Sequence, residues 1–267
     1  MIPLRDNIPA RNFPVVNTLL IAACGITFLL QLGDSSGTMV ERLGMIPARV
    51  LDGDAEVLVR DVTVTRFGAV REYLRPAEPP PFPAIFTLLS CIFLHGGWLH
   101  LLGNMWFLYI FGDNVEDRLG PGKYLLFYLG CGVAASFTHY ISGPGSTLPT
   151  LGASGAVAGV MGAYFLLYPR AQVVTLVPIF IFIQIMVLPA WVFLAFWFVI
   201  QFFSGAIAIS SVKSGGVAWW AHVGGFAAGM AAVASMRSQQ QLRPRIEVLP
   251  PEGEGRVRYR SEGRPRW

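Results

Sequence analysis

Long apolar runs separated by short polar segments dominate the pattern of this chain. Six runs predict helices, at about residues 15–32, 84–111, 124–141, 154–168, 190–209 and 217–236. A helix that crosses the roughly 30 Å core of a bilayer needs about 20 apolar residues, and most of these runs reach that length. The pattern therefore predicts an all-α, polytopic membrane protein, built as a bundle of six transmembrane helices.

The fourth run is shorter than the others and follows an irregular loop. A helix from Ser154 to Tyr168 is roughly 22 Å long at 1.5 Å per residue, less than the thickness of the bilayer core. The uncharged loop before it, residues 142–153, is rich in Gly, Pro and Ser. Irregular backbone at membrane depth is tolerated only inside the protein or beside a water-filled cavity. We therefore expect a short fourth helix that starts below the membrane surface.

Two segments between the predicted helices carry signals of their own. Residues 57–64 alternate like a strand. Residues 173–209 are apolar for too long to form one helix, and Pro178 and Pro189 divide them. We expect an interfacial piece there, followed by the fifth span from about Ala190.

The composition agrees with a membrane location. Of the 267 residues, 54% are hydrophobic and 13% are charged, and the mean hydropathy is +0.53, whereas soluble domains carry about 25% charged residues. The net charge of +4 comes from loops and tails, so we expect no nucleic-acid partner. The three cysteines, Cys24, Cys91 and Cys131, are scattered, which favours buried apolar roles over a disulfide or metal site.

The charged segments divide the chain into parts. Residues 1–13 form an N-terminal segment, 14–236 the membrane domain with a long charged loop at 33–83, and 237–267 a tail rich in Arg and Pro that we expect to be disordered. Positive residues favour the cytoplasmic side, so six spans place both termini in the cytoplasm and the 33–83 loop outside it. We expect a multi-pass protein of the cell (inner) membrane, with a tail suited to anionic lipid.

Polar residues inside the predicted spans are the candidates for chemistry. His100 and Asn104 are four residues apart and share one helical face, and His222 lies near the outer end of the last span. On the predicted topology these three and Ser154 all lie in the outer half of the bilayer. Taken alone, Ser154 would be explained as a helix N-cap.

Glycines on two of the predicted helices would let those helices approach closely. Gly155, Gly159 and Gly162 form one stripe, and Gly225 and Gly229 continue the face of His222. Such stripes also serve ordinary helix packing in membranes. Here they would in addition bring His222 close to Ser154.

These residues support one kind of catalysis better than the alternatives. A serine needs a neighbouring base to become a nucleophile, which His222 can supply, and a developing oxyanion needs donors, which His100, Asn104 and the Ser154 amide can supply. No acidic residue is available at this depth, so a hydrolase would use a Ser–His dyad. No HExxH motif is present, His95 and His100 diverge on a helix, and we expect neither a metal nor a cofactor. For His139 a solvated or hydrogen-bonded role is the simpler explanation.

At this point the sequence resembles the rhomboid family of intramembrane serine proteases. The matching motifs are His100-Leu-Leu-Gly-Asn104, Gly152-Ala-Ser154-Gly155, Ala221-His222-Val-Gly-Gly225-Phe-Ala-Ala-Gly229, Glu116-Asp-Arg-Leu-Gly120 and Gly44-Met-Ile-Pro-Ala-Arg49. The resemblance extends over about residues 12–236.

The resemblance implies specific roles for these residues. Ser154 would be the nucleophile, His222 its base, and Asn104, His100 and the Ser154 amide the oxyanion site, with Gly152 close to the substrate backbone. The implied substrates are single-pass membrane proteins, cut in or near the transmembrane segment. Ala158 stands where some members carry an aromatic residue against the histidine, so another residue must orient His222.

Two other classes of protein are alternatives to the protease. A rhomboid-like pseudoprotease that binds membrane-protein clients would share the fold, but usually lacks Ser154 or His222. A transporter or channel would need an ionisable path through the membrane, and the histidines here occupy only its outer half.

Overall fold

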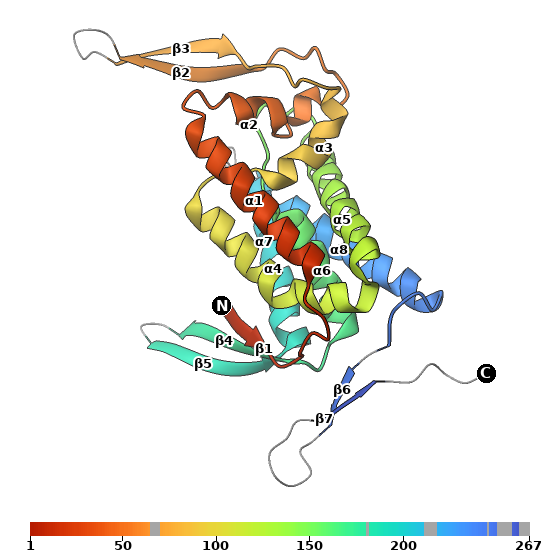
Figure 1. Ribbon diagram of the computed structural model, residues 1–267. Helices are drawn as coiled ribbons and strands as arrows, with labels where there is room; N and C mark the ends of the chain where they lie inside the picture. The colour runs from red at the N-terminus through yellow and green to blue at the C-terminus, as the bar shows by residue number, and fades with distance from the viewer. Residues whose placement is uncertain (65–69, 180–181, 211–217, 245, 250–257, 262–267) are drawn as a thin grey trace.

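The computed structural model describes residues 1–64, 70–179, 182–210, 218–244, 246–249 and 258–261. Most of the described chain is a helical bundle, with small sheets at its two ends (Figure 1). The elements are, in order, β1 (Ile2–Asp6), α1 (Val15–Gly33), α2 (Thr38–Leu43), η1 (Pro47–Arg49), β2 (Leu58–Val64), β3 (Val70–Pro76), η2 (Ala84–Phe86), α3 (Thr87–Ser90), η3 (Cys91–Phe93), α4 (Trp98–Leu119), α5 (Pro121–Ser142), α6 (Ser154–Leu167), β4 (Gln172–Ile179), β5 (Phe182–Pro189), α7 (Ala190–Ser210), α8 (Trp219–Ser238), β6 (Ile246–Leu249) and β7 (Arg258–Ser261).

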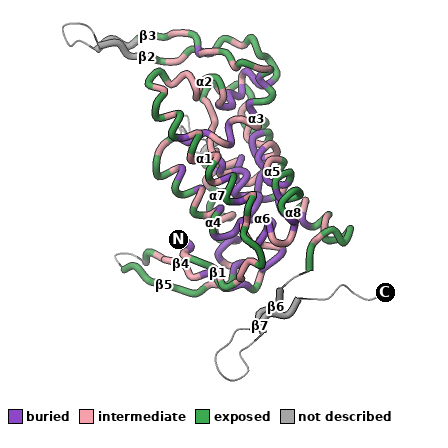
Figure 2. Tube along the Cα trace, viewed as in Figure 1, coloured by how far each residue is buried: buried purple, intermediate pink, exposed green. Residues whose placement is uncertain are grey.

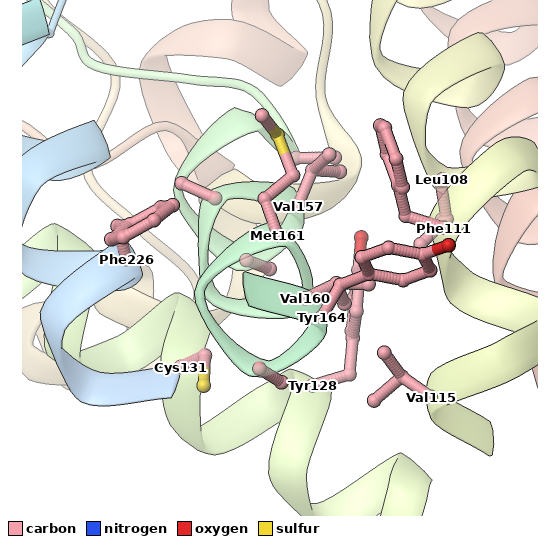
Figure 3. Close-up of a cluster of buried hydrophobic side chains, with 14 of the residues drawn as sticks. Leu108, Phe111, Val115, Tyr128, Cys131, Val157, Val160, Met161, Tyr164 and Phe226 are labelled. Carbon is pink, nitrogen blue, oxygen red and sulfur yellow. The ribbon is translucent and has the colours of Figure 1, made fainter. Parts of the chain in front are cut away.

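The short helix α6 is the centre of the bundle. Eleven of its 14 residues are buried, and it packs against α4, α5, α7 and α8. Its small residues admit the neighbouring backbones, while Phe111, Tyr128 and Phe226 from three of those helices fill the remaining space around it (Figure 3). Figure 2 shows the same arrangement as a buried centre within an exposed periphery. A helix buried on every side explains why its sequence is apolar all round.

Helices α6 and α8 touch through their backbones. A Cβ at Gly225 would collide with the carbonyl oxygen of Gly155, and a Cβ at Gly229 with that of Gly159. At Gly159 itself, a Cβ would lie 2.5 Å from the Cβ of Cys131 on α5. Close backbone approach of this kind is how small residues hold membrane helices together.

The apolar helices are those of a polytopic membrane protein. By length and hydropathy, three described helices can cross a membrane: α1, α5 and residues Ala190–Ile207 of α7. The pair Ala84–Phe93 and Trp98–Leu119 makes a fourth if it is counted as one bent span. The predicted count of six spans stays a prediction, because α6 has only 14 residues and α8 does not reach the same criterion within the described residues.

The second apolar run is not one helix. It forms the short turns η2, α3 and η3, and then α4, at an angle of 81° across the break. Gly97 has φ of +152° at this break, a conformation that favours glycine. Helix α4 also continues to Leu119, beyond the expected end of the run at Phe111. Hydropathy did not predict the bend, because it reports how apolar a segment is and not the direction of its backbone.

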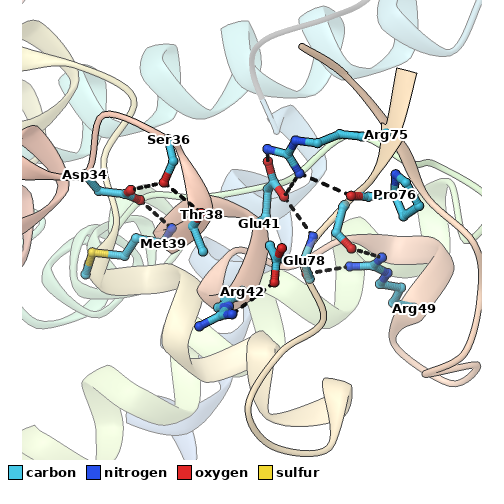
Figure 4. Close-up of polar contacts among 11 residues, drawn as sticks. Asp34, Ser36, Thr38, Met39, Glu41, Arg42, Arg49, Arg75, Pro76 and Glu78 are labelled. Carbon is cyan, nitrogen blue, oxygen red and sulfur yellow. Dashed lines mark hydrogen bonds and ion pairs between the residues drawn. The ribbon is translucent and has the colours of Figure 1, made fainter. Parts of the chain in front are cut away.

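The first loop has a part that contacts the rest of the bundle and a hairpin, β2–β3, that projects beyond it (Figure 1). The predicted strand at 57–64 is confirmed as β2, which pairs with β3. Arg49 is buried and donates to the carbonyl oxygens of Ala77 and Glu78 (Figure 4). It also donates to the carbonyl oxygen of Ala55. Four residues before Arg49, the backbone of Met45 exchanges hydrogen bonds of 3.0 and 2.7 Å with that of Thr150. The first loop therefore supports the 143–153 loop that leads into α6.

The interfacial piece expected near residue 173 is a β-hairpin. Strands β4 and β5 pair antiparallel, and β1 adds to β4 in the order β1-β4-β5. This sheet lies at the end of the bundle opposite β2 and β3 (Figure 1). Near the same end of the bundle, Arg11 donates to the carbonyl oxygen of Pro244. In the 237–267 tail, β6 pairs with β7, and the expected disorder of the tail stays a prediction.

Candidate active site

Ser154 and His222 lie in direct contact in the structure. Ser154 is the first residue of α6, and His222 is in the first turn of α8. The Nε2 atom of His222 lies 2.8 Å from the Oγ of Ser154. The glycine contacts between α6 and α8 fix this distance, because they leave no room between the two backbones.

Gly152 brings the loop before α6 close to His100. Its φ of +128° favours glycine, and a Cβ there would lie 2.7 Å from the Nε2 of His100. The same Cβ would lie 3.7 Å from the Oγ of Ser154. Only a glycine leaves open the space between the imidazole of His100 and the hydroxyl of Ser154. The backbone N–H of Gly152 points the other way and donates to the carbonyl oxygen of Cys91, at 3.0 Å.

The surroundings of His100 determine which of its ring nitrogens is a donor. The backbone N–H of Gly96 donates to its Nδ1 at 3.2 Å. In a neutral imidazole one nitrogen accepts and the other donates, so Nε2 carries the proton. That Nε2–H faces the space beside Gly152 and Ser154, where it can donate to a bound oxygen.

Asn104 lies one turn further along α4 and is buried. Its Nδ2 donates to the carbonyl oxygen of His100 at 3.0 Å. An amide nitrogen carries two hydrogens, so one stays available for a further acceptor. The structure thus places His100 and Asn104 on one helix, one turn apart, as their spacing predicts.

Sequence reasoning missed the residues that surround His222. Gln201 of α7 is buried, and its Oε1 lies 2.7 Å from the Nδ1 of His222. The rings of Trp197 and Trp219 flank the imidazole, with centroids 5.8 and 6.1 Å away. A signal was present, because an amide side chain inside a strongly apolar span is a candidate for function by default.

The other residues singled out in the sequence lie outside the Ser154–His222 pair. His95 is buried, and its ring contacts that of His100 edge to face, at 5.3 Å between centroids. The expected divergence of the two histidines on one helix is wrong, because His95 precedes α4. His139 is on α5, where its Nδ1 is buried and has no partner among the described residues. Glu116, of the quoted Glu116–Gly120 motif, has a structural part, since it accepts from the backbone N–H groups of Val16 and Asn17 and so caps α1. Among the described residues no three His, Cys, Asp or Glu side chains gather as metal ligands do.

Together these residues form one candidate site at the N-terminal end of α6. A hydroxyl lies within hydrogen-bonding distance of an imidazole, and ring and amide N–H donors lie on the neighbouring helix. Nucleophile, base and donors are the parts that acyl transfer requires. The class of protein is therefore a helical, multi-pass membrane protein with a serine–histidine pair inside its bundle.

Comparison with known proteins identifies the family. A family model described as the rhomboid domain matches residues 83–239, more than half of the chain. The protein belongs to the rhomboid family.

Similar curated proteins carry related names. The chain is 40% identical over 79 residues to Rhomboid-like protein 11, chloroplastic, of Arabidopsis thaliana (30% of this chain and 28% of that protein). It is 35% identical over 79 residues to Putative rhomboid protease YdcA of Bacillus subtilis (30% and 39%). It is 40% identical over 78 residues to Rhomboid protease GluP of the same organism (29% and 15%). The matches thus span less than half the length of these relatives.

Proposed function

We propose that this protein is an intramembrane serine endopeptidase that hydrolyses peptide bonds in or near the transmembrane segments of single-pass membrane proteins. The observation that carries the proposal is the 2.8 Å contact between Ser154 Oγ and His222 Nε2. Membership of the rhomboid family, which includes relatives named as proteases, supports the same conclusion.

The proposed reaction has two halves. In the first, Nε2 of His222 takes the proton of Ser154 as its Oγ attacks the carbonyl carbon of the scissile bond. The tetrahedral oxyanion collapses, the C–N bond breaks, and the imidazolium gives its proton to the leaving amine. In the second half, water attacks the acyl-enzyme, again with His222 as base, and Ser154 is regenerated.

Three donors are proposed to stabilise the oxyanion: the Nε2–H of His100, the free amide hydrogen of Asn104 and the backbone N–H of Ser154. Donors of this kind act strongly in a site that excludes water. Gly152, beside them, leaves room for the substrate backbone. An unwound substrate segment can pair as a strand with the loop before α6. The loop at 210–216 is a second candidate for this pairing, and residues 211–216 lie outside the described part of the chain.

The environment of the protein is also part of the proposal. We place it in the cell (inner) membrane with both termini in the cytoplasm, so that Ser154 opens toward the extracytoplasmic side. The division into residues 1–13, 14–236 and 237–267 follows from this topology. The Arg-rich tail would lie at the cytoplasmic surface, against anionic lipid.

Labelling with a fluorophosphonate probe tests the proposal. The purified protein in detergent should label at Ser154, and Ser154→Ala and His222→Ala should each abolish both labelling and cleavage of a transmembrane substrate. Ser142→Ala, which removes an exposed hydroxyl at the end of α5, is the matched control and should label like the wild type. Absence of labelling in folded wild-type protein would overturn the proposal and favour a client-binding pseudoprotease.

A further inference from the structure

The side of His222 that faces away from Ser154 is held by a neutral amide. Its Nδ1 lies 2.7 Å from the Oε1 of Gln201. Gln201 is only 7% exposed, so this contact is shielded from water. The two residues come from different helices, α7 and α8, and are 21 positions apart.

The chemistry of the two groups fixes the direction of this hydrogen bond. A carbonyl oxygen can only accept, so Nδ1 must be the protonated nitrogen of the neutral ring. Nε2 is then left with its lone pair, directed at the hydroxyl of Ser154. In the other tautomer Nε2 would carry a proton and could not act as a base toward Ser154.

We propose that Gln201 is the positioning residue of this site, which holds His222 in the tautomer and orientation needed to take a proton from Ser154. The proposal rests on the proposed protease function. It assigns to an amide on α7 the part that a carboxylate plays in Ser-His-Asp enzymes.

The surroundings explain why an amide can take this part. A carboxylate buried in a membrane protein pays a large desolvation cost, whereas an amide accepts a hydrogen bond without carrying charge. Among the described titratable groups, those whose charge acts on His222 are His100 of α4 and His139 of α5. Neither is a carboxylate. The flanking rings of Trp197 and Trp219 limit how far the imidazole can tilt, but an indole carries no acceptor on its ring nitrogen to select the tautomer.

The location of Gln201 makes the site depend on α7. This helix packs on α8 through Trp197 and Phe198, whose rings contact that of Phe226. A shift of α7 away from α8 would remove the acceptor from Nδ1 while leaving Ser154 in place on α6. The catalytic pair is therefore complete only when α7 lies against α8.

Two substitutions at one position separate a positioning role from a packing role. Gln201→Leu keeps most of the volume and removes the acceptor. We expect it to lower kcat and the rate of fluorophosphonate labelling by about 10- to 100-fold, the value of one hydrogen bond to a group that becomes charged, with KM and thermal stability little changed. Gln184→Leu, the same chemical change at an exposed position of β5, is the matched control and should have no effect.

Gln201→Glu supplies the decisive measurement. It restores an acceptor, so its activity should rise clearly above that of Gln201→Leu. A carboxylate also stabilises the imidazolium, so the acidic limb of the pH–rate profile should move up by about one pH unit or more. A residue that only fills space would not produce the rescue, and the shift of the pH profile shows that position 201 faces the imidazole.

The outcomes distinguish the two proposals. Wild-type protein that neither labels nor cleaves removes the protease function itself. If the wild-type protein labels, but Gln201→Leu has the wild-type rate and Gln201→Glu has the wild-type pH profile, only the role of Gln201 is overturned. If Gln201→Leu fails to fold, the pH profile of Gln201→Glu still decides the question.

Discussion

Gly225 of α8 lies so close to Gly155 of α6 that no side chain fits between them. An added Cβ at Gly225 would collide with the carbonyl oxygen of Gly155. Three residues before Gly225 in α8 is His222, and directly before Gly155 is Ser154, so the helix contact and the candidate catalytic pair are one feature. Packing here determines distance, and distance determines whether a proton can be transferred.

Gly225→Ala should therefore lower both activity and stability. Separating two packed helices costs about 1–3 kcal/mol, while a displacement of a reacting group by about 1 Å can cost 100-fold in rate. The labelling rate and the thermal unfolding of the purified variant measure the two effects. Gly130→Ala on α5, where an added Cβ meets nothing within 4 Å, serves as control, and equal labelling of both variants would contradict the prediction.

Gly152→Ala should disable the site without unfolding the bundle. The alanine would have to adopt φ near +128° and its Cβ would meet the ring of His100 at 2.7 Å. We expect labelling to fall by at least about 10-fold, because His100 must move away from the oxyanion position. Gly145→Ala, in the same loop but with open space around it, should label normally. A fully active Gly152→Ala variant would show that this approach is unimportant.

Asn104→Ala should lower turnover by about 10- to 1000-fold, since loss of one oxyanion donor typically costs about 100- to 1000-fold and two further donors remain here. The reason is the amide hydrogen that the hydrogen bond to the carbonyl oxygen of His100 leaves free. KM for a transmembrane substrate should change little, since the interaction forms in the transition state. Steady-state kinetics measure both constants, and an unchanged kcat would remove Asn104 from the mechanism.

Asp6 predicts a pH dependence of stability at the end of the bundle away from the candidate site. Burial raises the pKa of Asp6 from 3.8 to about 6, although the hydrogen bond donated by Tyr164 acts in the opposite direction. Between these values the folded state binds the proton more tightly than the unfolded state does. The free energy of unfolding therefore falls as the pH rises from about 4 to 6, by on the order of 2 kcal/mol.

Asp6→Asn tests this dependence. Its unfolding midpoint minus that of the wild type should become more positive as the pH rises from about 4 to 7, because only the wild type loses a bound proton. Asp52→Asn, at an exposed position in the first loop, should give a difference that does not vary with pH. A constant difference for Asp6→Asn would show that Asp6 titrates alike in both states.

The Arg-rich tail predicts a dependence on lipid charge. In vesicles that contain anionic lipid, trypsin should cut the tail several-fold more slowly than in purely zwitterionic vesicles, because its arginines are drawn to the surface. High salt should remove the protection. Equal cleavage rates in the two lipids would rule out this partner.

The sequence by itself determined the class of the protein and supplied the candidate residues of the site. Apolar runs must be buried in lipid or in protein, so their length and spacing predict membrane helices. The same rule draws attention to Ser154, His100, Asn104 and His222. Polar groups at membrane depth are costly, so they are found mainly where they serve a function. The strand β2 could likewise be predicted, since alternation is a local property.

Other features depend on contacts that no local pattern encodes. The bend before α4 and the β4–β5 hairpin follow from backbone geometry, to which hydropathy is insensitive. Glu116 caps a helix about 100 positions earlier in the chain. The partner of His222 on its Nδ1 side, Gln201, is 21 positions away on another helix. The sequence supplied the residues able to do chemistry, and only the tertiary structure decided which atoms meet, because meeting depends on how closely α6, α7 and α8 can approach one another.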